Sequence, residues 1–243
     1  MQEIIFIFVV LLIGSFAQGV SGFGFGLIAM SILPYFFTVK ESTILVITLT
    51  LFITLRILSK QYKNLDWKGL IPVLSSAIVG RGVGFFILTY FGDLEILKTW
   101  LGIILLLMVI YLMWSKKIMM HSKQMTTFIA IVIGFIGGVV GGVFAVGGPF
   151  YVFYFLMVYA DKGRYNANLQ AVFFITSLIT VLLHGINGDY GTSSILYVLV
   201  GLVAVLIGTS LGLKAFTKVS ASVVRRMAIL LVACSAINFI FFH

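Results

Sequence analysis

The stretch Gly19-Val-Ser-Gly-Phe-Gly-Phe-Gly26 decides the fold, because it returns 123 residues later as Gly142-Val-Phe-Ala-Val-Gly-Gly-Pro149. The two copies share glycine at their first and sixth positions. Five glycines lie within residues 14–26 and seven within residues 134–148, so 12 of the chain's 25 glycines occupy 28 positions. Glycine at this density interrupts a helix. Both stretches are therefore predicted to be helix breaks.

The breaks lie inside apolar segments that are too long for one straight crossing of a bilayer. Only 9% of the residues are charged and 61% are hydrophobic, whereas a soluble domain has about 25% charged residues. Residues 4–37 and 126–159 would each form a helix of about 50 Å, against a bilayer core of about 30 Å. We predict an all-α integral membrane protein of 8–10 membrane segments, with six further spans at 42–59, 69–91, 94–114, 165–187, 192–213 and 223–242.

The loop charges indicate how the two long segments are threaded. If each crosses the membrane once, the basic loop residues divide 8 against 6 between the faces. If each enters and returns as a broken-helix hairpin, 12 share one face and only Lys40 and Lys98 lie on the other. Basic loops gather on the cytoplasmic side, so the hairpin threading is favoured. It predicts a multi-pass protein of the plasma membrane with its positive loops in the cytoplasm. Because no basic region precedes the first apolar segment, we expect it to be a membrane segment rather than a cleaved leader.

Each half of the chain then contains a hairpin and three full spans, which is an odd number of crossings. We therefore predict two inverted repeats, 1–118 with its hairpin at 4–37 and 119–243 with its hairpin at 126–159. A shift of 128 also superposes the pair Gly80 and Gly84 on Gly208 and Gly212. Such i, i+4 glycine pairs also favour close helix packing, which is the alternative explanation of the glycine pattern.

Paired helix breaks near the bilayer midplane are typical of substrate sites in inverted-repeat transporters. The second helix of each hairpin is expected to begin near Gly24 and Gly147, with Pro149 in its opening turn. Free N–H groups at helix N-termini attract anions. Arg81 lies near the centre of the span 69–91, and no acidic residue lies inside any span. A buried guanidinium is costly without a partner, so we expect an anionic substrate, water or a hairpin carbonyl beside it.

We predict a substrate site built from both breaks, one arginine and one glutamine. Gln18 and Ser21 are expected to donate hydrogen bonds from the first break, and Gln170 from the polar span 165–187, where Ser177 shares its helix face. Alternatives stay open: Arg81 could cap the hairpin C-termini, and Gln170 could form an interhelical bond. The predicted site comprises Gln18, Ser21, Gly22, Phe23, Gly24, Phe25, Gly26, Arg81, Val146, Gly147, Gly148, Pro149 and Gln170.

Other ionisable residues point away from enzymatic chemistry. The three histidines are scattered, which gives no metal-binding spacing, and no catalytic set, cofactor or metal is expected. The net charge of +9 comes from dispersed loop residues without a nucleic-acid-binding motif. His184 is expected at the membrane interface, with a role in proton coupling as the alternative. Arg56 is expected to reach the interface, with a role in substrate binding as the alternative. The expected partners are a small anion and the lipid bilayer, for a monomer or homo-oligomer.

The segments Gly19–Pro34 and Gly134–Phe150, followed by Gly80-x3-Gly84 and Gly208-x3-Gly212, resemble the TauE/SafE family of sulfite-exporter permeases over nearly the whole chain. The resemblance implies transport of small sulfur-containing anions such as sulfite or sulfonates. The chain departs from the family at Gly24-Phe25-Gly26, where a tighter glycine run is usual, and Phe25 is expected to narrow the site. We predict a transporter for a small anion such as sulfite, thiosulfate or a sulfonate, and the alternatives are an anion channel or a non-transporting assembly subunit.

Overall fold

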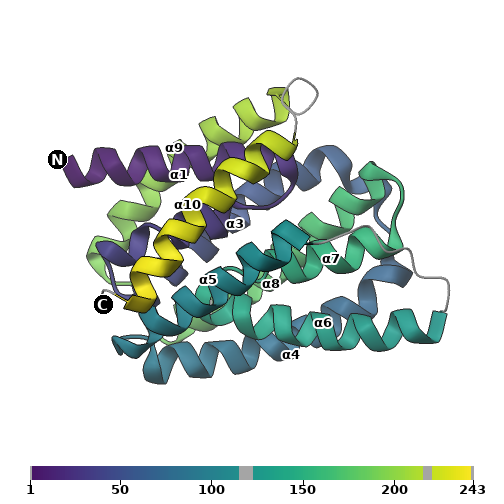
Figure 1. Ribbon diagram of the computed structural model, residues 1–243, viewed down its shortest axis with the longest axis horizontal. Coiled ribbons are helices and arrows are strands. Elements are labelled where there is room, and N and C mark those ends of the chain that lie inside the picture. The colour runs from purple at the N-terminus through teal and green to yellow at the C-terminus, as the bar shows by residue number, and fades with distance from the viewer. Residues whose placement is uncertain (1, 115–122, 216–220, 242–243) are drawn as a thin grey trace.

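The protein is a bundle of helices, shown by the computed structural model in Figure 1, which describes residues 2–114, 123–215 and 221–241. These residues contain helices joined by turns and no strand. The elements are α1 (Gln2–Ser21), α2 (Phe25–Met30), η1 (Leu33–Tyr35), α3 (Val39–Gln61), η2 (Tyr62–Asn64), α4 (Trp67–Phe91), α5 (Ile96–Trp114), α6 (Lys123–Phe144), α7 (Gly148–Val158), α8 (Lys162–Ile186), α9 (Thr192–Ala215) and α10 (Ala221–Phe241).

Side chains at the helix starts satisfy the free backbone N–H groups there. Thr38 and Glu41 form a reciprocal capping box at the start of α3. Asp66 accepts a hydrogen bond from the Gly69 N–H at the start of α4, and Asp161 accepts one from the Arg164 N–H at the start of α8. Asp66 and Asp161 therefore lie in polar loops at the starts of α4 and α8, outside the apolar part of either helix.

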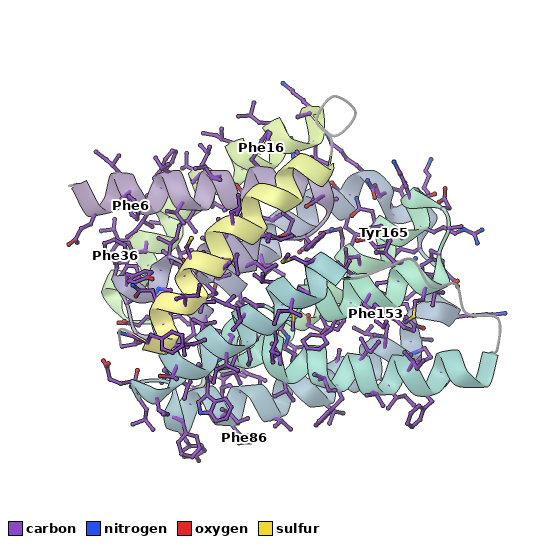
Figure 2. The ribbon with its side chains drawn as sticks, viewed as in Figure 1. Phe6, Phe16, Phe36, Phe86, Phe153 and Tyr165 are labelled. Carbon is purple, nitrogen blue, oxygen red and sulfur yellow. The ribbon has the colours of Figure 1, made fainter. Side chains whose placement is uncertain are left out.

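Within the described residues, six helices are long and apolar enough to cross a membrane, namely α1, α3 with η2, α4, α6, α8 and α9. The predicted spans 94–114 and 223–242 are not among them and contain the shorter apolar helices Ile96–Ile110 and Val232–Phe241. Large apolar side chains point outward from this bundle, as Figure 2 shows for Phe86 at one edge. Phe86 is 59% exposed and Phe128 is 69% exposed. A soluble protein seldom exposes so much apolar surface. Together with the six long apolar helices, these exposed side chains confirm the prediction of a helical membrane protein.

Both long apolar segments are broken at the predicted glycines. In the first, α1 ends at Ser21 and α2 begins at Phe25, and in the second, α6 ends at Phe144 and α7 begins at Gly148. The short helices fold back on the preceding ones: Gly14 of α1 faces Phe25 and Ile28, and Gly137 of α6 faces Phe150 and Tyr151. Each segment thus reverses direction instead of continuing straight.

The hairpin helices pack against helices from the opposite half of the chain, α1 along α9 and α4 along α6 (Figure 1). A Cβ added to Gly84 would lie 2.9 Å from the Gly142 Cα, and one added to Gly19 would lie 2.9 Å from the Gly212 Cα. These four glycines therefore permit close helix crossings, as the packing explanation of their spacing predicts.

The loops gather as the hairpin threading requires. The Lys40 ammonium lies 2.9 Å from the Asp189 carboxylate, so the loops before α3 and after α8 share one face. The Asp66 N–H donates to Asn168 of α8, and the Tyr159 hydroxyl donates to Asp66, so the loops before α4 and after α7 meet elsewhere. A single crossing of the segment 126–159 would place the Lys40 and Asp189 loops on opposite faces.

Candidate functional site

The same unusual backbone conformation ends α1 and α6. Gly22 has φ 84° and Ala145 has φ 55°, and these positions are 123 residues apart. The Gly22 N–H donates to the Gln18 carbonyl at 2.7 Å, and the Ala145 N–H donates to the Gly141 carbonyl at 3.1 Å. A left-handed residue with this bond is a common helix terminator. It turns the chain, and the next helix begins four residues after the previous one ends.

The two breaks touch each other. The Gly26 Cα packs against the Ala145 carbonyl, with no room for a side chain. A Cβ on Gly148 would lie 4.0 Å from the Phe23 Cβ, again across the two breaks. Because α2 and α7 both begin here, the breaks bring exposed backbone from both halves of the chain to one place.

A cavity of about 30 Å³ lies between the breaks, enough for on the order of two water molecules. Eight of the predicted site residues line it: Gln18, Gly24, Gly26, Arg81, Val146, Gly147, Gly148 and Pro149. The remaining lining residues are Leu27, Ile47, Thr50, Ala145, Phe173 and Ser177. Thr50, Arg81 and Ser177 all lie in the middle third of their helices, so the cavity is at mid-depth in the bundle.

Arg81 is the charged residue of the cavity wall, and it is only 4% exposed. One terminal guanidinium nitrogen, Nη1, donates to the Gly141 carbonyl at 2.6 Å, which is the carbonyl that also accepts the cap of α6. The Nε has no hydrogen-bond partner. Arg81 therefore binds a hairpin carbonyl, as the sequence suggested, and its Nε retains an unused N–H donor.

A chain of amides holds the other break. Gln170, which is fully buried, donates to the Gly22 carbonyl at 2.7 Å and to the Asn166 side chain at 3.0 Å. Gln18 reaches the Gln170 carbonyl oxygen at 3.5 Å and also lines the cavity. Gln170 itself does not line the cavity, so it positions the end of α1 and meets the cavity only through Gln18.

Four further predicted site residues lie outside the cavity wall. The Ser21 hydroxyl donates to the Ala17 carbonyl oxygen at 2.7 Å and lies 2.6 Å from the Phe23 carbonyl oxygen. Its hydrogen bonds therefore stay within the first break. Gly22 provides the turn. Phe23 contacts the second break without reaching the cavity. The expectation that Phe25 narrows the site is wrong, because its ring is buried against Gly14 on the α1 side of α2.

Two ionisable residues outside the cavity have different surroundings from each other. Arg56 is exposed, as expected for a side chain that reaches the interface. His184 lies in the last turn of α8, next to the polar loop as expected, but it is buried: it is 1% exposed, and its Nδ1 lies 2.6 Å from the Asp189 carboxylate. Its sequence position near a helix end gave no sign that the following loop would fold over it.

Ile47, Thr50 and Phe173 are wall residues that sequence reasoning missed. Ile47 and Phe173 are apolar residues within apolar spans, so nothing in their sequence surroundings marked them as wall residues. Ser177, which shares a helix face with Gln170, does line the cavity, and its hydroxyl has no partner. Among the described residues, no group of three or more His, Cys, Asp or Glu side chains could hold a metal ion.

Comparison with known proteins identifies relatives of the whole chain. A family model described as "Sulfite exporter TauE/SafE" matches residues 6–239. A protein of Cupriavidus necator described as "Probable sulfite/organosulfonate exporter TauE" is 24% identical over 222 residues, which cover 88% of this chain and 85% of that protein. No solved structure matches the chain.

Proposed function

The chain belongs to the sulfite exporter TauE/SafE family, and from this membership we propose that it carries a small sulfur-containing anion, namely sulfite, thiosulfate or a sulfonate, through the cavity between its helix breaks. The family consists of transporters and not enzymes. An exporter of sulfite or organosulfonates is also what the Cupriavidus necator relative is described to be. The open questions are therefore the cargo, the binding site and the pathway.

The observation that carries the site is the unpaired Nε of Arg81. A buried guanidinium has five N–H donors, and burying it with donors unused costs free energy. Among the described residues, no carboxylate lines the cavity. An oxyanion bound beside Arg81 would supply both the missing charge and the missing acceptor.

Other groups of the cavity are also donors. The Ser177 hydroxyl is unpaired and buried, and the Gln18 amide reaches Gln170 only at 3.5 Å. The N-terminus of the eleven-residue α7 begins at Gly148 in the cavity wall and adds a partial positive charge. A site of donors without acceptor carboxylates favours an anion over a cation.

The two halves of the chain form inverted repeats in this proposal, 1–118 and 119–243. The equivalent left-handed caps and the reciprocal packing of α1 on α9 and of α6 on α4 support it. The sparsely basic face with Lys40 and Lys98 lies outside the cell, and the basic loops lie in the cytoplasm. Repeats that rock about a central site would expose it to each side in turn.

Uptake into proteoliposomes tests the site. We expect saturable uptake of radiolabelled sulfite, thiosulfate or a sulfonate, and Arg81→Gln should lower kcat/KM at least about 30-fold, because truncating a buried charged donor costs about 2–5 kcal/mol. Arg56→Gln is the matched control, since Arg56 is exposed on α3, and it should retain uptake within about twofold. Equal uptake by the two variants would contradict the site, and absence of uptake of any of these anions by the unaltered protein would contradict the cargo.

A further inference from the structure

A second hollow lies close to the central cavity and is separated from it by a thin barrier. This vestibule has a volume of about 400 Å³, against about 30 Å³ for the central cavity. Its wall includes Lys40 and Ile44 of α3, together with Asp189 and Tyr190 from the connection between α8 and α9. It opens on the sparsely basic face of the protein.

One face of α3 connects the two hollows. Lys40 and Ile44 line the vestibule, and Ile47 and Thr50 line the central cavity. Spacings of three and four place these side chains on one side of a helix. At a rise of 1.5 Å per residue, Ile44 and Thr50 are only about 9 Å apart along the axis.

A hydrogen bond crosses this short interval. The Thr48 and Tyr190 hydroxyl oxygens are 2.8 Å apart, and Thr48 is 8% exposed. Thr48 lies one turn beyond Ile44, so its position along the α3 axis falls between Ile44 of the vestibule and Thr50 of the central cavity. Its hydroxyl also donates to the Ile44 carbonyl at 2.7 Å, within α3. Tyr190 forms part of the vestibule wall from a different element. The bond therefore joins α3 to the α8–α9 connection at the barrier.

A charged cluster fixes the same connection just above the bond. Asp189 binds Lys40 at 2.9 Å and His184 at 2.6 Å, and the Asn187 amide donates to it at 3.0 Å. Burial by itself would raise the pKa of Asp189, but the hydrogen bonds from His184, Lys40 and Asn187 and the charge of Lys40 outweigh it, so this pKa is below its ordinary value. Asp189 is thus ionised at neutral pH and anchors Tyr190.

We propose that Tyr190 and its hydrogen bond to Thr48 form the gate between the vestibule and the central cavity, with the Asp189 cluster as its anchor. The proposal rests on the proposed function in that the central cavity is the substrate site. In the closed gate Tyr190 bridges to α3. For an anion to pass, the α8–α9 connection must separate from Thr48, which breaks one hydrogen bond.

Thiol labelling in the central cavity tests the gate without any substrate. The single cysteine is first removed as Cys234→Ser, and Ser177→Cys then provides a reporter in the cavity wall. The purified protein in detergent is treated with a charged methanethiosulfonate, so labelling does not depend on membrane orientation. Thr48→Val and Tyr190→Phe should each raise the labelling rate about threefold to tenfold, the factor given by the net loss of one hydrogen bond.

The matched control is Thr54→Val on the same helix. The Thr54 hydroxyl bonds only to the Thr50 and Leu51 carbonyls within α3, so its loss should leave the labelling rate within about twofold. The double variant Thr48→Val with Tyr190→Phe should label no faster than the faster single variant, because each single variant already removes the bond between the two side chains. Thr50→Cys replaces the reporter if Ser177→Cys fails to yield a monodisperse protein.

The outcomes separate the gate from the transport proposal. Labelling rates for Thr48→Val and Tyr190→Phe equal to that of Thr54→Val would overturn the gate, whatever the uptake assay gives. Absence of anion uptake by the unaltered protein, together with faster labelling in the two gate variants, would overturn the anion cargo and retain the gate.

Discussion

The two helix breaks share a backbone and differ in chemistry. Each ends a long helix with a left-handed residue 123 positions from the other, and each starts a short helix at the central cavity. The first break has side-chain amides around it, Gln18 on α1 and Gln170 behind. In the second break the Gly141 backbone carbonyl accepts a hydrogen bond from Arg81 of α4. Similar backbone at the two breaks thus has different side chains beside it, with the positive charge of Arg81 at the second.

The difference extends to how each break is held. Gln170 of α8 donates to the Gly22 carbonyl in the first break, and Thr43 of α3 donates to the Val143 carbonyl at 2.9 Å in the second. Each hairpin is therefore tied to helices of the other half, the first by an amide network and the second by the Thr43 hydroxyl together with the Arg81 guanidinium. The comparison teaches that two stretches with the same backbone conformation can be held by different side-chain chemistry.

The largest effect should come from filling the contact between the breaks. Gly26→Ala places a Cβ on the Ala145 carbonyl, and because that atom belongs to the backbone it cannot move aside. We expect a loss of about 3 kcal/mol or failure to fold, measured by thermal unfolding in detergent. Gly148→Ala is the control, since its Cβ would lie 3.4 Å from the Phe173 ring, an ordinary contact. Equal unfolding temperatures for the two variants would show that the breaks do not depend on this approach.

A smaller effect should distinguish the two ties. Gln170→Leu leaves the Gly22 carbonyl and the Asn166 oxygen without their donor, and we expect a destabilisation of about 2 kcal/mol. Thr43→Val removes one hydroxyl bond and should cost about 1 kcal/mol. Both are measured by the same unfolding assay. A larger loss for Thr43→Val would reverse the interpretation that the amide network is the stronger tie.

The smallest effect concerns the left-handed caps themselves. Ala145 adopts a conformation that costs a side-chain-bearing residue about 1 kcal/mol, so Ala145→Gly should stabilise the protein by about 0.5 kcal/mol after the entropy of the unfolded glycine is counted. Gly22→Ala should act in the opposite sense, because Gly22 has φ 84° and faces Asn166. The two shifts in unfolding temperature should have opposite signs, and the same sign for both would refute the equivalence of the caps.

The sequence by itself determined the breaks and the spans at 42–59, 69–91, 165–187 and 192–213, because both depend on local properties. Apolar run length decides whether a helix can cross a bilayer, and glycine decides where the backbone can take φ above zero or approach another helix. Counting loop charges was sufficient to favour hairpins over single crossings, and the Lys40–Asp189 contact agrees with that threading. The position of Pro149 in the opening turn of α7 could likewise be predicted, since proline fits a first helical turn.

Only the tertiary structure decided which side chains meet. Phe25 turned away toward Gly14, His184 became buried under the Asp189 loop, and Ile47 and Thr50 of α3 joined the cavity wall, because these outcomes depend on which helices pack across the two halves. The partner of Arg81 could be narrowed to an anion, water or a carbonyl, but its choice of Gly141 required the close crossing of α4 and α6. Local sequence fixes where a helix can end, while contacts between segments distant in sequence fix what it then faces.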